Sequence, residues 1–296
     1  MYTGHFGLNE KPFSISPNPR YLYLSQRHAD ALAHLLYGVS ETGGFIQLTG
    51  EVGTGKTTLI RSLLEQLPDK TEIALILNPK LQSKQFLQAI CQELNVAYRR
   101  LDTAKELIDL LNERLLALHA TDHRVVLIVD EAQTMSPQLL EQVRLLTNLE
   151  TSERKLLQII LTGQPELREL LAQENMRQIA QRITGRFHLE PLSAADIAIY
   201  VNHRIRIAGG RPDIFSSGAI RRLFRLSRGI PRLINIIADR ALLAAYTREE
   251  ITIGPGLVSQ AAAEVFGRSA NRRWHPWTSS AAGVALFLWS TSLLVS

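Results

Sequence analysis

The sequence contains a single cysteine, Cys91, among its 296 residues. One thiol excludes an internal disulfide and any metal site built from several cysteines. Cys91 lies in the apolar stretch 86–91, so we expect it to be a small residue of the core. The eight histidines lack the spacing of His-Glu-x-x-His or of a comparable ligand set. The composition therefore indicates neither a disulfide scaffold nor a metal centre built from cysteine or histidine.

The sequence also lacks an apolar leader at its start, because residues 1–20 are polar and rich in proline. We therefore expect the large N-terminal part of the chain to remain in the cytoplasm. The net charge is +5, and arginine is concentrated in the second half. A charge of this size is compatible with nucleic acid, an anionic membrane surface or a solvated face, and it does not distinguish among them.

Charged residues are absent from the segment 278–296, which is mostly apolar or small. At about 1.5 Å per residue, a helix over this segment would reach roughly 28 Å, close to the ~30 Å hydrocarbon core of a bilayer. The preceding segment 268–277 carries arginines followed by tryptophans, which is typical of the cytoplasmic margin of a membrane helix. We expect a linker over 268–277 and a transmembrane helix over 278–296. An apolar tail helix is the alternative, because serine and threonine dilute the segment.

The most informative motif is Gly-Glu-Val-Gly-Thr-Gly-Lys-Thr at 50–57, directly after the apolar run 45–49. Glycines let the turn point backbone N–H groups at phosphate oxygens, and the following helix adds its positive end. Lys56 would reach the outer phosphates, and the Thr57 hydroxyl would bind Mg²⁺. The motif predicts a site for a nucleoside triphosphate. Its expected binding residues are Gly50, Glu51, Val52, Gly53, Thr54, Gly55, Lys56, Thr57 and Thr58.

A second motif follows the aliphatic run 125–129, which reads as a strand buried on both faces of a parallel sheet. Such a strand delivers its next residues to the carboxyl edge of the sheet, where ligands bind. Asp130 would hold Mg²⁺, and Glu131 would polarise the attacking water. The pair therefore predicts nucleotide hydrolysis in addition to binding.

Strands and helices alternate from residue 45, which predicts an α/β core with a parallel sheet and flanking helices. From residue 193 the pattern contains helices only, and Ser-Ala-Ala-Asp at 193–196 reads as a capped helix start. We expect strands at 45–49, 72–77, 125–129, 156–161 and 186–192. The expected organisation is an N-terminal segment (1–44), a P-loop core (45–192), a small all-α lid (193–267) and the C-terminal membrane helix.

Further motifs surround the phosphate loop. They are Phe6-Gly7-Leu8, Pro12-Phe13, Pro17-Asn18-Pro19-Arg20-Tyr21-Leu22-Tyr23, His28, Leu35-Leu36-Tyr37-Gly38, Leu145-Leu146-Thr147-Asn148-Leu149-Glu150-Thr151 and Gly163-Gln164-Pro165-Glu166-Leu167. With them the chain resembles, over about residues 1–266, the AAA+ ATPases of the ExeA/GspA type of the general (type II) secretion pathway. MshM-like ATPases of pilus systems are close to these. The resemblance implies ATP with Mg²⁺, and the sequence lacks the guanine-reading motif Asn-Lys-x-Asp.

The resemblance also implies roles for residues outside the two motifs. Gln164, or alternatively Thr162, would be the sensor at the end of the fourth strand. Arg232, at the start of a lid helix, would be the second sensor. Arg182, or alternatively Arg186, would act as an arginine finger in the site of a neighbouring subunit, which requires a homo-oligomer. The N-terminal segment, with Phe13 and Tyr23, would run near the adenine.

The function implied is that of an ATPase anchored in the inner membrane by a single span, with its ATPase domain in the cytoplasm. It would assist assembly of a secretion or pilus machine together with an inner-membrane partner of the GspB/ExeB type. Relatives continue into a peptidoglycan-binding domain that is not in this sequence, which puts direct cell-wall binding in doubt. Either a simple tail anchor or a version without the exported domain fits. The alternative function is a DNA-associated ATPase of the transposition-helper type, although no nucleic-acid-binding motif stands out.

Overall fold

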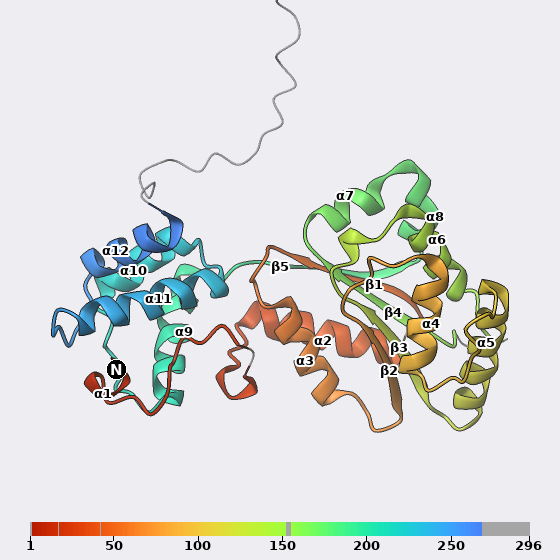
Figure 1. Cartoon of the computed structure of the whole chain (residues 1–296), viewed down its shortest axis with the longest axis horizontal. Helices are drawn as coiled ribbons and strands as arrows, with labels where there is room; N and C mark the ends of the chain where they lie inside the picture. The colour runs from red at the N-terminus through yellow and green to blue at the C-terminus, as the bar shows by residue number, and fades with distance from the viewer. Residues whose placement is uncertain (1, 17, 42, 152–154, 268–296) are drawn as a thin grey trace, which may run out of the picture.

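A parallel sheet lies at the centre of the α/β lobe in the computed structural model, which describes residues 2–16, 18–41, 43–151 and 155–267 (Figure 1). Within these residues the sheet has five strands in the order β2-β3-β4-β1-β5, and all neighbours are parallel. The strands are β1 (Gly44–Gly50), β2 (Thr71–Ile76), β3 (Arg124–Val129), β4 (Gln158–Gly163) and β5 (Ile183–Leu189). The α/β fold with a parallel sheet is therefore confirmed.

Helices cover both faces of the sheet, as the aliphatic run of β3 requires. Val126 and Ile128 pack with α2 and α3 on one face, whereas Leu127 and Val129 belong to the core under α4, α5 and α6 on the other. These helices are α2 (Gln26–Glu41), α3 (Lys56–Gln66), α4 (Ser83–Glu93), α5 (Ala104–Ala120) and α6 (Pro137–Leu146), followed by the shorter α7 (Glu166–Ala172) and α8 (Arg177–Ala180). Cys91 is fully buried in this core, as expected, and burial raises the pKa of its thiol to about 11.

The last strand differs from its predicted position, because β5 begins at Ile183 and ends at Leu189 instead of covering 186–192. Ile183 pairs with Phe45, and a bulge in the register then follows. Residues 190–192 instead form the connection to the lid, where the N–H of Leu192 donates to the carbonyl of Gly229. The sequence prediction missed this start because β5 is an edge strand whose residues mostly alternate between half-buried and exposed, so no apolar run marks where it begins.

The second lobe contains α9 (Ala194–Ile207), α10 (Ser217–Ser227), α11 (Pro231–Tyr246) and α12 (Pro255–Phe266). The predicted cap of α9 is present: Ser193 Oγ accepts from the N–H of Asp196, whose carboxylate accepts from the N–H of Ser193. The start of the chain, including α1 (Tyr2–His5), lies against this lobe (Figure 1). Phe6, Leu8 and Phe13 belong to the lid core.

Arg204 fastens the N-terminal segment to the lid. This α9 side chain is only 7% exposed. Its guanidinium donates to the carbonyls of Pro12 (2.6 Å) and Ser14 (3.0 Å) and to the hydroxyl of Tyr200 (3.1 Å), and it lies 4.7 Å from the ring centre of Tyr21. Its donors are therefore used inside the protein, so Arg204 gives no support to a nucleic-acid surface on the lid.

In residues 2–267, apart from the short undescribed gaps, no helix combines the length and the apolar character needed to cross a membrane. The predicted linker 268–277 and transmembrane helix 278–296 lie outside the described residues.

Replacing Arg204 tests the fastening of the N-terminal segment. We expect Arg204→Ala to lower the free energy of unfolding by about 2–4 kcal/mol, because buried carbonyls lose charged donors. Urea unfolding followed by circular dichroism measures this loss, and limited proteolysis should cut before residue 15. The control is Arg206→Ala on the same helix, whose side chain is exposed. Equal stability of the two variants would contradict the assigned role.

Candidate nucleotide-binding site

The turn between β1 and α3 has the strand–turn–helix form that the motif predicts. Gly53 and Gly55 have φ of 84° and 107°, which side-chain-bearing residues rarely adopt. No side chain caps the first turn of α3, so its free N–H groups are available for an anion. A Cβ on Gly50 would lie 2.7 Å from the carbonyl oxygen of Leu189, so this position also requires glycine. The turn is thus built for a ligand that accepts hydrogen bonds.

Lys56 lies behind this turn and is only 6% exposed. Its Nζ donates to the carbonyls of Gly50 (2.7 Å) and Glu51 (3.1 Å). Burial lowers the pKa of Lys56, whereas the charges of Glu131 and Asp130 raise it. Gly50 and Glu51 thus contact Lys56 through their carbonyls. They do not line the adjacent cavity, whereas the loop residues from Val52 to Thr58 do.

Asp130 follows β3 and lies against the loop, with 8% of its surface exposed. Thr57 Oγ1 donates to its Oδ2 (3.3 Å), and Thr162 Oγ1 donates to its Oδ1. The hydroxyl of Thr57 and the carboxylate of Asp130 are hard oxygen donors. Such a donor set fits Mg²⁺, which takes one or two protein ligands beside phosphate and water. Among the described residues, no group of three or more His, Cys, Asp or Glu could hold a different metal.

Glu131 is held by two side-chain amides. Gln133 Nε2 donates to its Oε2 at 2.6 Å, and Gln164 Nε2 donates to the same oxygen at 3.2 Å. Gln133 Oε1 also accepts from the N–H of Gln164 (3.1 Å), and a Cβ on Gly163 would lie 2.5 Å from that oxygen. The two sensor candidates thus have different partners, since Gln164 contacts Glu131 and Thr162 contacts Asp130. The sequence analysis did not predict a role for Gln133. Its position two residues after Glu131, inside a one-turn helix (Ala132–Thr134), could have indicated that the two side chains are close.

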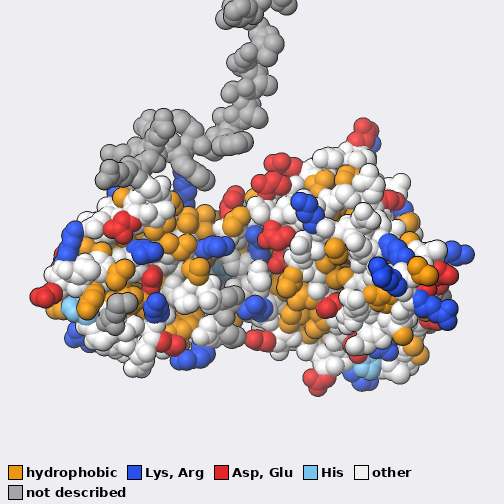
Figure 2. Space-filling view, in the orientation of Figure 1, with side chains coloured by type: hydrophobic (Ala, Val, Ile, Leu, Met, Phe, Trp, Pro, Cys, Tyr) orange, Lys and Arg blue, Asp and Glu red, His pale blue; other side chains and the backbone are white. Residues whose placement is uncertain are grey.

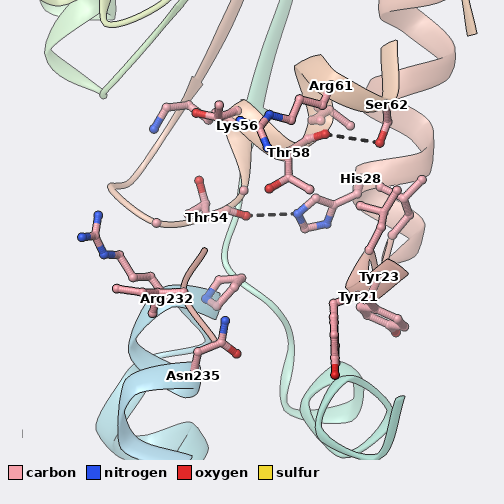
Figure 3. A pocket seen from close by; sticks show the side chains of 18 of the residues that line it. Tyr21, Tyr23, His28, Thr54, Lys56, Thr58, Arg61, Ser62, Arg232 and Asn235 are labelled. Carbon is pink, nitrogen blue, oxygen red and sulfur yellow. Dashed lines mark hydrogen bonds between the residues drawn. The ribbon is translucent and has the colours of Figure 1, made fainter. Parts of the chain in front are cut away.

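Arg232 joins the lid to the loop. Its backbone N–H donates to the carbonyl of Gly53 (3.2 Å), and a Cβ on Gly53 would lie 2.6 Å from the Cβ of Arg232. Figure 3 shows the Arg232 side chain beside the loop, and it lines the cavity. The predicted second sensor therefore lies where the lid meets the phosphate loop.

Arg182 lies outside the cavity lining. Its Nη1 donates to Thr147 Oγ1 (2.6 Å) and to Asn148 Oδ1 (2.7 Å), so it is held against the end of α6. The alternative, Arg186, is exposed and donates to the carbonyl of Ala180 (2.8 Å). Neither arginine reaches the site of its own chain in this structure.

The cavity itself, of about 370 Å³, lies between the loop, the N-terminal segment and the lid (Figure 3). This volume is within the usual range for small-molecule sites. Tyr23 lines it and packs edge-on against Tyr200 of the lid, with ring centres 5.8 Å apart. Phe13 does not line it: this side chain is 1% exposed and packs edge-on against Phe215. The N-terminal segment thus lines the cavity through Tyr23 and residues 14–16, whereas the lid core buries the Phe13 ring.

His28, on α2, contacts the loop at Thr54 and lines the same cavity as the lid residues Tyr200 and Arg232. Its Nε2 lies 3.1 Å from the carbonyl oxygen of Thr54, and its Nδ1 lies 2.6 Å from Ser25 Oγ. Burial lowers the pKa of His28, so the neutral ring predominates at pH 7. A carbonyl only accepts, so Nε2 carries the hydrogen and Ser25 donates to Nδ1. The sequence analysis quoted His28 within a motif but assigned it no role.

Comparison with known proteins agrees with this geometry. The model of the AAA domain family matches residues 39–171. The general secretion pathway protein A of Aeromonas hydrophila is 56% identical over 274 residues, which cover 93% of this chain and 50% of that protein. The chain therefore spans about half the length of the curated relative that it matches.

Solved structures show the same fold at low identity. Cdc6p of Pyrobaculum aerophilum has a TM-score of 0.66 and 20% identity, covering 86% of this chain and 70% of that one. The ORC2 protein of Aeropyrum pernix, in ADPNP–ADP complexes, has a TM-score of 0.64 and 18% identity, covering 86% and 72%. These likenesses establish the AAA+ P-loop fold alone. With the AAA domain match and the high identity to the Aeromonas hydrophila protein, the chain belongs to the ExeA/GspA type of AAA+ proteins.

Proposed function

We propose that this chain is a membrane-anchored cytoplasmic ATPase that binds and hydrolyses Mg²⁺-ATP to assist assembly of a secretion or pilus machine in the bacterial envelope. The observation that carries the catalytic part is the contact between Thr57, at the start of α3, and Asp130, at the end of β3. It brings the phosphate loop and the acidic pair to one place. A site that only binds nucleotide needs Thr57 and Asp130 for the ion but has no need of Glu131, the second carboxylate.

Each side chain has a separate task in the proposed reaction. Lys56 leaves the loop carbonyls for the outer phosphates. Thr57 and Asp130 would hold Mg²⁺, which would supply positive charge to neutralise the phosphates. Glu131 accepts the proton of the attacking water. Gln164 and Gln133 orient the Glu131 carboxylate through the hydrogen bonds that they already make. Arg232 contacts the phosphates from the lid, so the position of the lid changes when the phosphates change.

The envelope part of the proposal is supported by the name of the Aeromonas hydrophila relative, general secretion pathway protein A. It is supported as well by the charge-free segment 278–296 and the basic, tryptophan-bearing segment before it. In this proposal the lid moves with the nucleotide cycle, and the motion reaches an inner-membrane partner through 268–277. The chain would act as a homo-oligomer if Arg182 completes the site of a neighbouring copy.

The DNA-associated alternative has less support. Acidic and basic side chains are interspersed on both lobes of the face seen in Figure 2. Arg204 is used internally, and Arg222 donates to Ser259 Oγ (2.8 Å) within the lid. A nucleic-acid surface would instead present clustered cations with free donors.

Variants of the two central residues separate binding from turnover. We expect Lys56→Ala to weaken binding of a fluorescent ATP analogue by about tenfold or more, because it removes a charged donor to phosphate. Glu131→Gln should keep the affinity within a few-fold and lower kcat by about a hundredfold or more, because the base is lost. Fluorescence titration and phosphate release measure the two quantities. Exposed Lys105→Ala and Glu113→Gln, both on α5, are the controls. Normal turnover by Glu131→Gln would refute its assignment.

Mixed subunits test whether Arg182 acts in a neighbouring site. Arg182→Ala alone should bind nucleotide and lose turnover, since its own site lacks the finger from the next copy. Adding an excess of Lys56→Ala subunits, which bind nucleotide more weakly but still carry Arg182, should restore part of the phosphate release per Arg182→Ala subunit. Arg186→Ala is the parallel variant. No restoration at any mixing ratio would argue against a shared site.

Fractionation of cells tests the membrane anchor. The full chain should sediment with membranes and resist carbonate extraction, whereas a version ending at Trp277 should be soluble. Protease added to the outside of spheroplasts should leave the ATPase lobe intact, because it faces the cytoplasm. If both versions are soluble and purify with nucleic acid, the anchor is wrong and the DNA-associated alternative is favoured.

A further inference from the structure

Two consecutive carbonyls of the phosphate loop accept hydrogen bonds from outside the loop. The carbonyl of Gly53 accepts from the N–H of Arg232, at the start of lid helix α11 (3.2 Å). The carbonyl of Thr54 accepts from Nε2 of His28 on α2 (3.1 Å). In Figure 3 His28 and Arg232 lie on opposite sides of the loop. The loop is therefore fixed from two directions by elements that precede and follow the core in sequence.

Fixing these carbonyls has an electrostatic consequence for an anion. A carbonyl oxygen carries partial negative charge, so one that turns into the cavity would repel a phosphate. The same peptide plane carries the N–H of the next residue on its other side. Holding the Thr54 carbonyl towards His28 thus points the N–H of Gly55 the opposite way, because the two groups lie on opposite sides of one trans peptide.

His28 is itself held rigidly enough to do this. It is 5% exposed, and the short bond to Ser25 fixes the ring through Nδ1. Its helix is anchored by Leu32 and Leu35, which are buried in the core under one face of the sheet. A Cβ on Gly55 would lie 3.4 Å from Nε2, so the loop backbone passes close to the ring.

The chain just before His28 is attached to the lid. Tyr23 packs on Tyr200, and its hydroxyl lies 3.5 Å from Asp196 Oδ1. Arg204 stacks on Tyr21. Only Leu24 and Ser25 and the first turn of α2 separate this lid-bound stretch from the contact with Thr54. A shift of the lid therefore acts on the loop at two neighbouring peptides, through Arg232 and through His28.

We propose that His28 is a positioning residue for nucleotide binding, which holds the Thr54 carbonyl out of the phosphate site and links the lid-bound N-terminal segment to the loop. The inference rests on the proposed nucleotide function of the same cavity. It adds a determinant of affinity that lies outside the phosphate-loop motif.

Three replacements of His28 in the full chain test this role. The amide nitrogen of glutamine can occupy the place of Nε2, whereas that of asparagine reaches only the place of Nδ1. His28→Gln should therefore keep the bond to Thr54 and bind a fluorescent ATP analogue with Mg²⁺ within about threefold of the unchanged protein. His28→Asn and His28→Ala should bind about tenfold more weakly or worse, because the carbonyl loses its donor. Thermal unfolding by circular dichroism identifies the folded variants.

The control is His34→Asn, an exposed residue of the same helix, which should keep its affinity. Wild-type affinity in His28→Asn, or equal weakening in His28→Gln and His28→Asn, would overturn the proposal. A lower melting temperature with unchanged affinity would overturn it as well, since that describes a purely structural residue. If the unchanged protein fails to bind the analogue, the proposed nucleotide function fails first, and this result is distinct from the others.

Discussion

The turn between β1 and α3 must direct its N–H groups towards a polyanion and its carbonyl oxygens away from it. The rest of the site depends on this constraint. Glycine is needed at positions 53 and 55, because the turn takes positive φ there. The same constraint explains why other side chains occupy the loop carbonyls. Lys56 donates to those of Gly50 and Glu51, and His28 donates to that of Thr54. A short, glycine-rich turn has little conformational preference of its own, so external contacts supply its shape.

The same contacts tie three parts of the chain into one site. The first residues of the N-terminal segment, such as Phe6 and Phe13, pack in the lid core, and its helix α2 packs on the sheet. The segment therefore crosses between the two lobes. The lid contacts the loop through Arg232, and the strand ends supply Asp130 and Glu131. Because each part contacts the loop or its neighbours, a ligand that draws the lid inward changes the same hydrogen bonds that shape its own binding site. This arrangement provides a physical route from nucleotide state to lid position.

The sequence was most informative where structure is set by neighbouring residues. The phosphate loop, the aliphatic run of β3 and the Ser193 cap are local patterns, and each has the predicted form. Contacts between distant segments could not be read in this way. The bond of His28 to Thr54 spans 26 positions and that of Arg204 to Pro12 spans 192, and no periodicity encodes such pairs. The burial of Phe13 in the lid core could not be predicted for the same reason, since an isolated apolar residue does not reveal which of two cores buries it.

The most direct test of the account is a crystal structure of the Glu131→Gln chain with ATP and Mg²⁺. The account predicts the triphosphate along the N–H groups of residues 53–57, with the ion between Thr57 and Asp130. The Thr54 carbonyl should still point to His28, and the base should lie between the Tyr23 segment and the lid. A nucleotide bound elsewhere on the chain, or a triphosphate facing the carbonyls of Gly53 and Thr54, would contradict it.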